Sequence, residues 1–178
     1  MNIQLDQNRT VLLFKRQNSC IFEPPKRLNK HDLLSKKAKY AINALVHLAK
    51  KEQDGPVLIS TVSAAENIPQ KFLEAILLDL KNAGILASKK GRGGGYYLIQ
   101  KPAQVNLADV MRIFDGPIAF LPCVTHKYYE RCEECIDEES CGIRDAFLHV
   151  RNKTVEILKS SNLEQIIQRE QELKKGSG

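Results

Sequence analysis

Residues 85–99 read Ile-Leu-Ala-Ser-Lys-Lys-Gly-Arg-Gly-Gly-Gly-Tyr-Tyr-Leu-Ile, a pattern typical of a strand, a glycine-rich turn and a second strand. Glycines tolerate positive φ and allow another molecule to approach the backbone closely. A phosphate-binding nucleotide loop would need Gly-Lys-Ser/Thr followed by a helix, whereas here two tyrosines and a strand follow. The stretch therefore predicts a β-hairpin with a basic tip formed by Lys89, Lys90 and Arg92. The alternative is a solvated hairpin whose lysines only keep an edge strand soluble.

Three helices are predicted upstream of this hairpin. Ser35 is expected to cap the first helix, Pro69 closes a short second helix over 58–68, and Gly84 follows a third helix over 70–83. The expected buried positions, in chain order, are Ala38, Ala41, Ile42, Leu45, Leu48, Ala49, Leu58, Ile59, Val62, Ala65, Ile68, Phe72, Leu73, Ile76, Leu77 and Leu80. Two helices joined by a short turn and followed by a hairpin indicate a winged helix-turn-helix. In that fold the third helix enters the major groove of DNA, and the hairpin contacts phosphates or the minor groove.

Downstream of the hairpin, a helix is expected to begin after Asn106 and to stop at Asp115-Gly116-Pro117. A long helix over 143–160 follows later, and a shorter one begins at Leu163. The apolar face expected for the long helix comprises Ile143, Phe147, Val150, Thr154, Ile157 and Leu158. The winged-helix core is expected to be complete without this helix, so a second copy of the chain is the economical partner for its apolar face. The alternative is that the helix folds back on its own domain.

Four cysteines lie within 19 residues, with the spacing Cys123-x8-Cys132-x2-Cys135-x5-Cys141, in an acidic loop. Four thiolates can hold an iron–sulfur cluster or a structural zinc ion. Zinc fits one Cys-x2-Cys pair plus two outlying cysteines less well, and no thioredoxin-like setting surrounds that pair. A metal-free disulfide between Cys132 and Cys135 remains an alternative.

Composition narrows the classes of function. The 178 residues carry a net charge of +6, and 43% are apolar, which suits one compact domain or a small domain with a dimerisation element. The absence of Trp and the 6% aromatic content disfavour propellers, solenoids and aromatic-rich sugar binders. The sequence shows neither a membrane span nor a secretion signal, so we expect a cytoplasmic protein. It also lacks a catalytic constellation, so we expect no enzyme.

The fold class expected from these patterns is mainly α with a small β-hairpin, as a winged helix-turn-helix domain plus a long dimerisation helix. Residues 1–33 are expected to be a poorly structured extension, and Cys20 within them a bystander. A basic arm there that touches DNA through Lys26, Arg27 and Lys30 is the alternative. The later segments are the DNA-binding domain 34–117, the cysteine loop 118–141, the dimerisation and C-terminal helices 142–173, and a disordered tail 174–178.

From Leu34 to about Leu173 the chain resembles the Rrf2 family of bacterial transcription regulators. The resemblance is carried by Leu-Ser-Lys-Lys-Ala-Lys-Tyr-Ala (34–41), Ile-Pro-Gln-Lys-Phe-Leu-Glu (68–74), Lys-Gly-Arg-Gly-Gly-Gly-Tyr (90–96), Asn-Leu-Ala-Asp-Val-Met-Arg-Ile-Phe-Asp-Gly-Pro (106–117) and the cysteine loop. It implies a homodimer that binds double-stranded promoter DNA. In cluster-carrying members, DNA affinity changes when an iron–sulfur cluster is gained, lost or damaged.

The resemblance also implies site residues. Family cysteines match Cys123, Cys141 and one of Cys132 or Cys135, whereas Arg144 stands where some members have a histidine ligand. We therefore expect all four loop cysteines to be ligands of an iron–sulfur cluster, [2Fe-2S] favoured over [4Fe-4S], with zinc as the alternative. His126 is expected to be a solvated loop residue.

The DNA-contacting residues expected are Ser35, Lys36, Lys37, Lys39, Tyr40, Gln70, Lys71, Glu74, Lys89, Lys90, Arg92, Gly93 and Gly94. Of these, Lys90 matches the wing arginines of the family, and Glu74 matches a position that influences which DNA sites are tolerated. The function expected is a regulator that senses iron–sulfur status, redox state or nitric oxide. The alternative keeps the DNA reader and makes the cysteine loop a zinc site or a metal-free thiol switch.

Overall fold

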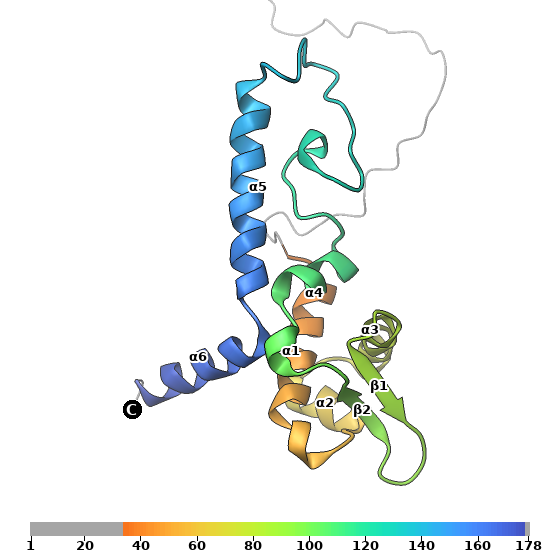
Figure 1. The fold of residues 1–178 in the computed structure, drawn as a ribbon. Helices are drawn as coiled ribbons and strands as arrows, with labels where there is room; N and C mark the ends of the chain where they lie inside the picture. The colour runs from red at the N-terminus through yellow and green to blue at the C-terminus, as the bar shows by residue number, and fades with distance from the viewer. Residues whose placement is uncertain (1–33, 177–178) are drawn as a thin grey trace, which may run out of the picture. The chain divides into compact units, whose positions relative to one another are not determined.

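The computed structural model of the protein describes residues 34–176, which contain six α-helices and one antiparallel hairpin (Figure 1). The expected extension 1–33, with Cys20 and the basic arm, lies outside the described residues, as do residues 177–178. The helices are α1 (Lys36–Lys50), α2 (Ile59–Glu66), α3 (Gln70–Asn82), α4 (Leu107–Phe114), α5 (Gly142–Ser160) and α6 (Leu163–Lys175). The strands are β1 (Leu86–Lys89) and β2 (Gly95–Leu98), and short 3-10 turns are η1 (Glu52–Asp54), η2 (Pro102–Gln104) and η3 (Pro122–Val124). Helix α6 thus extends two residues into the segment expected as a tail.

Local signals set the helix ends as expected. The Ser35 hydroxyl accepts the backbone N–H of Ala38 at 3.1 Å, and the Asn106 side chain accepts the N–H of Asp109 at 3.0 Å. Each of these bonds satisfies a donor that the first turn of a helix leaves free. After α3 the chain turns through Gly84, whose φ of +73° is left-handed.

One hydrophobic core joins helices α1, α2, α3, α4 and α6 to the hairpin. Its buried members are Ala41, Ala44, Leu45, Leu48, Ala49, Val62, Ile68, Leu73, Ile76, Leu77, Leu80, Ile85, Leu86, Val105, Val110 and Leu163. None of these residues belongs to α5, as expected of a core that is complete without the long helix, whereas α6 joins the core through Leu163. Leu163 is 1% exposed, and burial of a leucine side chain stabilises a fold by about 1.5–3 kcal/mol.

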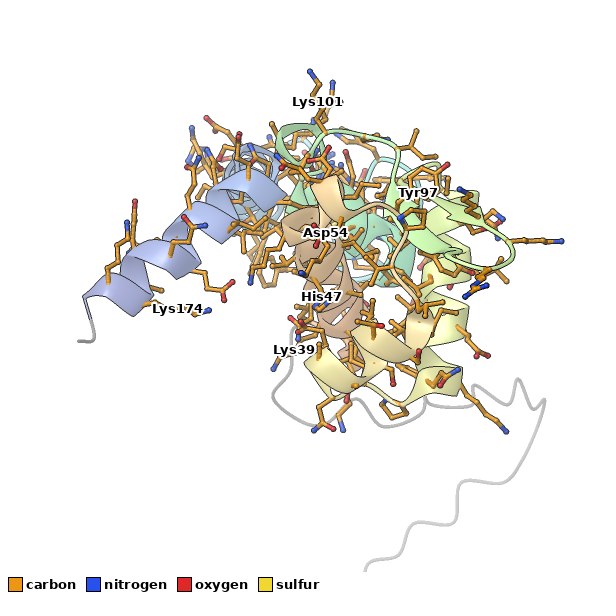
Figure 2. All side chains as sticks on the ribbon, turned by 90° about the horizontal axis from the view of Figure 1, so that it is seen from below. Lys39, His47, Asp54, Tyr97, Lys101 and Lys174 are labelled. Carbon is orange, nitrogen blue, oxygen red and sulfur yellow. The ribbon has the colours of Figure 1, made fainter. Side chains whose placement is uncertain are left out.

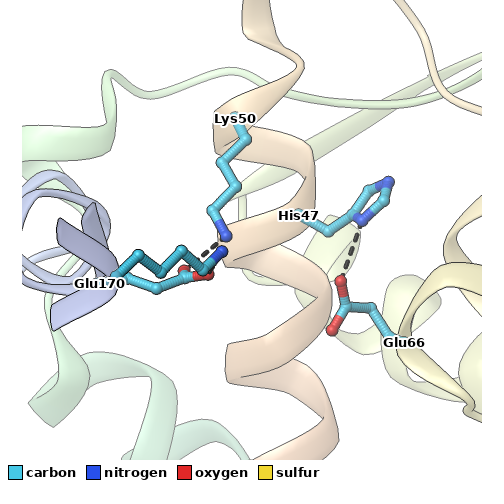
Figure 3. A network of polar contacts seen from close by, with 5 residues as sticks. His47, Lys50, Glu66 and Glu170 are labelled. Atoms are coloured by element: carbon cyan, nitrogen blue, oxygen red, sulfur yellow. Dashed lines mark hydrogen bonds and ion pairs between the residues drawn. The ribbon is translucent and has the colours of Figure 1, made fainter. Parts of the chain in front are cut away.

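Polar contacts also attach α6 to the rest of the domain. The Lys50 ammonium on α1 lies 2.5 Å from a Glu170 carboxylate oxygen on α6, as the close view in Figure 3 shows. Lys174 and Lys50 together hold the pKa of Glu170 down at about 2. On the other side of α1, His47 Nδ1 lies 3.0 Å from Glu66 Oε1 of α2 (Figure 3).

Three positions expected in the core are exposed instead. Phe72 is 41% exposed because it lies at the edge of the apolar face of α3, where its ring packs edge-on against Tyr40 with centroids 5.8 Å apart. Leu58 is 55% exposed because it precedes α2 as its N-cap rather than lying on the helix face. Ala65 is exposed on the outer side of α2.

The apolar face expected for the long helix splits into two in α5. Phe147, Thr154 and Leu158 are half-buried on the side where α5 contacts α4 and η3. Ile143, Val150 and Ile157 remain 68%, 43% and 63% exposed. They are spaced by seven residues, so they form one stripe along the helix.

Within the described residues, no helix has the length and apolar character needed to cross a membrane.

Candidate nucleic-acid interface and cysteine site

Helix α3 presents a polar outer face. Its inner face is anchored by Leu73, Ile76, Leu77 and Leu80, which are fully buried. Gln70, Lys71 and Glu74, all expected as DNA contacts, are exposed on the outer side. The Gln70 amide lies 3.4 Å from the Glu74 carboxylate, so these two side chains are neighbours on one surface. The packing of α3 therefore leaves its polar residues available to another molecule.

The hairpin is held close to the helical domain by a third extended segment. Val57 exchanges two backbone hydrogen bonds with Tyr96, of 2.9 and 2.8 Å. At Gly95 φ is +151°, and a Cβ there would lie 2.2 Å from the Val57 carbonyl oxygen. Only glycine therefore fits at this position.

The tip of the hairpin carries the basic residues that the sequence singled out. Lys89, Lys90 and Arg92 are exposed, as is Gly93. Gly94, in contrast, is buried. A Cβ at this position would lie 2.4 Å from the Lys89 carbonyl oxygen. Gly94 thus shapes the turn and offers little surface to a ligand.

Helix α3 and the hairpin border an open concavity of about 520 Å³, together with the start of α2. Lys81, Lys89 and Lys90 line it, as does Gln70. Lys81 also donates to the Ser88 hydroxyl at 2.8 Å, which ties the hairpin to α3. Lys81 was missing from the expected contacts. It lies seven residues after Glu74 on the same helix, and that spacing could have revealed it.

At the start of α1, some basic side chains are exposed to solvent and one is held by a partner inside the domain. Lys36 and Lys39 are exposed, and Figure 2 shows Lys39 on α1 and Tyr97 on β2 at the surface. Lys37 is held at 2.6 Å by Asp79 of α3, and its ammonium lies 5.4 Å from the Phe114 ring centroid.

Two other expected contacts near α1 also have partners inside the domain. Ser35 acts as the N-cap, and Tyr40 packs on Phe72. These two residues, with Lys37, therefore have structural roles in addition to any contact with DNA.

The structure gathers part of the cysteine set at the start of α5. Cys141 is the N-cap of α5, and its sulfur accepts the backbone N–H of Arg144 at 3.4 Å. This hydrogen bond, followed by one from the Cys135 thiol, lowers the pKa of Cys141. The hydrogen bond to Cys141, together with desolvation, raises the pKa of Cys135 to about 11. Cys141 is therefore the sulfur of the pair that loses its proton more readily.

The other two loop cysteines differ in their surroundings. Cys132 is half-buried, and its Sγ lies 3.5 Å from a Glu134 carboxylate oxygen. Cys123 is 6% exposed and lies in η3, which packs against α5. In the described part of the chain, no three His, Cys, Asp or Glu side chains converge in a metal-binding arrangement. The structure thus does not gather the four expected ligands at one centre, and it leaves Cys123 in a turn of its own.

Acidic residues of the loop are used to shape it. The Tyr129 hydroxyl hydrogen-bonds both carboxylate oxygens of Glu138, which raises the pKa of Tyr129. Asp137 accepts hydrogen bonds from the hydroxyl and the N–H of Ser140, and the pKa of Asp137 is lowered as a result. His126 is exposed, and its Nε2 lies 2.9 Å from Arg151 Nη1.

The donors present suit a soft metal centre. The loop carries four thiols, the pKa of Cys141 is lowered, and the loop is held by its own polar contacts. Thiolates are the preferred ligands of iron–sulfur clusters and of structural zinc. The four loop cysteines therefore fit such a group by ligand type.

Comparison with known proteins decides the family. A family model named Rrf2 and described as an iron-dependent transcriptional regulator matches residues 34–169. The chain belongs to the Rrf2 family. This confirms the resemblance seen in the sequence, and the helices and hairpin described above confirm the winged-helix fold class.

Individual relatives agree with this assignment. An rrf2-like HTH-type transcriptional regulator of Rhodobacter capsulatus is 39% identical over 138 residues, which cover 76% of this chain and 92% of the relative. The HTH-type transcriptional regulator CymR of Bacillus subtilis is 28% identical over 133 residues, or 75% of this chain and 88% of CymR. The solved structure of CymR, the global cysteine regulator of B. subtilis, matches with a TM-score of 0.65 and 27% identity over 78% of this chain and 98% of that one. The protein is thus a DNA-binding regulator of the Rrf2 family, and its relatives are transcriptional regulators rather than enzymes.

Proposed function

We propose that this Rrf2-family protein acts in the cytoplasm as a homodimer on promoter DNA, and that the loop cysteines hold an iron–sulfur cluster through which it senses iron–sulfur status, redox state or nitric oxide. The observation that carries the DNA-binding half is the concavity between α3 and the hairpin. Exposed cationic side chains border it, and α3 offers a polar outer face. Cations in such a groove neutralise phosphates, while side chains on the helix reach base edges.

The stripe on α5 supports the homodimer. Ile143, Val150 and Ile157 are exposed with heptad spacing, whereas α6 buries its own apolar face against the core. Two antiparallel or parallel copies of such a stripe bury each other by knobs-into-holes packing. A two-fold dimer then presents two α3 helices, which suits a two-fold symmetric DNA site.

The cluster half of the proposal rests on the cysteine loop. Cys123, Cys132, Cys135 and Cys141 would hold the group, [2Fe-2S] favoured over [4Fe-4S], and when bound it supplies a centre that responds to oxidants and nitric oxide. Cys141 caps α5, so the loop that carries the other thiols is tied to the first turn of this helix. Cys123 lies in η3, and η3 packs against the same helix. A change in the loop is therefore placed to change how α5 sits on α4, and with it the spacing of the two α3 helices.

The second candidate keeps the DNA reader and makes the loop a zinc site or a metal-free thiol switch. The opposite pKa shifts of Cys135 and Cys141 support it, because a thiol with a lowered pKa is the better attacking group in disulfide formation. Metal analysis separates the candidates directly.

The experiment is anaerobic purification with determination of iron, acid-labile sulfide and zinc, joined to a promoter-binding assay of the loaded and stripped forms. We expect iron and sulfide in equal amounts, and a change in DNA affinity on stripping. Serine variants of each loop cysteine should lower the iron content, and Cys20→Ser is the matched control outside the loop. Zinc in place of iron would support the second candidate. The absence of salt-dependent DNA binding would refute the DNA-binding half.

A further inference from the structure

A cavity of about 290 Å³ lies between the end of α4, the segment 116–128 and α5. It shares no lining residue with the DNA-facing concavity, and none of its lining residues is a cysteine. Arg112 reaches it from α4, His126 and Lys127 from the segment after η3, and Arg151 from α5. Three parts of the chain thus bring cationic or imidazole side chains to one hollow.

The charge of this hollow is unbalanced. Its lining in the described residues includes Arg112, Lys127 and Arg151 but no carboxylate. Arg151 Nη1 contacts His126 Nε2 at 2.9 Å and the Asn152 amide oxygen at 2.8 Å, and within the described chain it has no carboxylate partner. Two guanidinium groups with so little compensation make a site that attracts anions.

The negative charges nearby do not cancel this excess. Asp109 lies 3.0 Å from Arg112 Nη1, but the pair is an exposed i,i+3 contact on α4, which water screens. Lys127 lies 5.8 Å from the ring centroid of its neighbour Tyr128, a contact that leaves its charge uncompensated.

Apolar groups form the rest of the wall. Pro117, Ile118 and Val155 line the cavity beside the charged residues. Ligand sites are commonly about 300–1,000 Å³, apolar with a few polar groups that fix orientation, so this one suits a small molecule. We propose that the cavity binds a small organic anion, with its carboxylate or phosphate held by Arg112 and Arg151 and its hydrocarbon part against Val155.

The cavity stays open in the homodimer proposed above. Arg151 and Val155 face α4, whereas the stripe of Ile143, Val150 and Ile157 is on a different side of α5. Arg151 follows Val150 directly, and consecutive residues of an α-helix point about 100° apart. Partner binding along the stripe therefore leaves Arg151 accessible, and a bound anion would bridge α4 to α5 within one chain.

The test is isothermal titration of the full chain with inorganic phosphate, citrate and benzoate, each at the same ionic strength set by sodium chloride. We expect saturable binding of at least one of these anions with one site per chain. Comparison of phosphate with the two carboxylates identifies the preferred head group. Arg151→Gln and Arg112→Gln should each weaken this binding at least ~10-fold, because each removes a charge-assisted hydrogen bond.

Lys159→Gln is the matched control, because it removes the same charge from α5 at an exposed position that does not line the cavity. Its affinity should equal that of the unaltered chain. Far-UV circular dichroism of all three variants verifies the fold. Unchanged affinity in a folded Arg151→Gln variant would overturn the proposal, as would the absence of saturable binding by all three anions at millimolar concentration. Neither result depends on DNA binding or on a metal.

Discussion

Substitution of Gly95 by alanine should unfold the junction between the hairpin and the helical domain. The added Cβ would lie 2.2 Å from the Val57 carbonyl oxygen, so Val57 and Tyr96 must separate. Two backbone hydrogen bonds, of 2.9 and 2.8 Å, are then lost, at about 0.5–1.5 kcal/mol each. Alanine at a φ of +151° adds strain of about 1–3 kcal/mol. The sum is a loss of about 2–6 kcal/mol in the free energy of unfolding.

Gly93→Ala is the matched control in the same turn. Its φ of +75° also penalises alanine, but nothing lies within 4 Å of the added Cβ. We therefore expect a loss of only about 1 kcal/mol there. The assay is urea unfolding followed by circular dichroism, with DNA binding by fluorescence anisotropy as a second readout. If the two variants differ by less than about 1 kcal/mol, the contact between Gly95 and Val57 does not hold the hairpin as we describe.

Three further predictions follow from the same structure. Leu163→Ala should lower the free energy of unfolding by about 2–5 kcal/mol in urea titrations, because Leu163 is 1% exposed within the core; a loss below about 1 kcal/mol would place α6 outside it. Lys90→Ala should reduce the slope of log K against log salt concentration by about 0.9, measured by anisotropy with promoter DNA, if Lys90 neutralises one phosphate; an unchanged slope would remove it from the interface. Glu170→Gln should remove stability that is present above the ordinary pKa of 4.5 and lost as pH falls toward the folded-state pKa of about 2. Because the Glu170 side chain is 35% exposed, the loss in the free energy of unfolding should stay below about 1 kcal/mol. Urea unfolding at several pH values between 6 and 3 should show that the difference between the variant and the unaltered chain becomes smaller as pH falls. A difference that does not change with pH would contradict the prediction.

The proposed DNA-facing surface depends on contacts between separate elements of the fold. The polar face of α3 and the basic hairpin meet in one concavity because Lys81 of α3 bonds Ser88 and because Val57 pairs with Tyr96. In the proposed function, α5 joins the cysteine loop to the dimer surface, since Cys141 caps it and it carries the exposed stripe. These links are the route by which we propose that a change in the cysteine loop reaches the DNA-facing surface.

The positions of the helix ends and of the glycine turn could be predicted from the sequence, because they depend on residues only a few positions away. Ser35 caps a helix whose third residue it bonds, Asn106 does the same for α4, and Gly84 supplies a left-handed φ. The motifs around these signals were also sufficient to identify the family. Such interactions need no tertiary partner, so residue type and spacing determine them.

Only the tertiary structure decided which surfaces meet. Periodicity shows that a helix has an apolar side, but not which other element covers it, because burial depends on distant parts of the chain. That is why α6 enters the core through Leu163, why the face of α5 divides in two, and why Lys37 pairs with Asp79, 42 residues away. For the same reason the sequence did not predict the cavity lined by Arg112 and Arg151. The two charges lie close together only because α4 packs against α5.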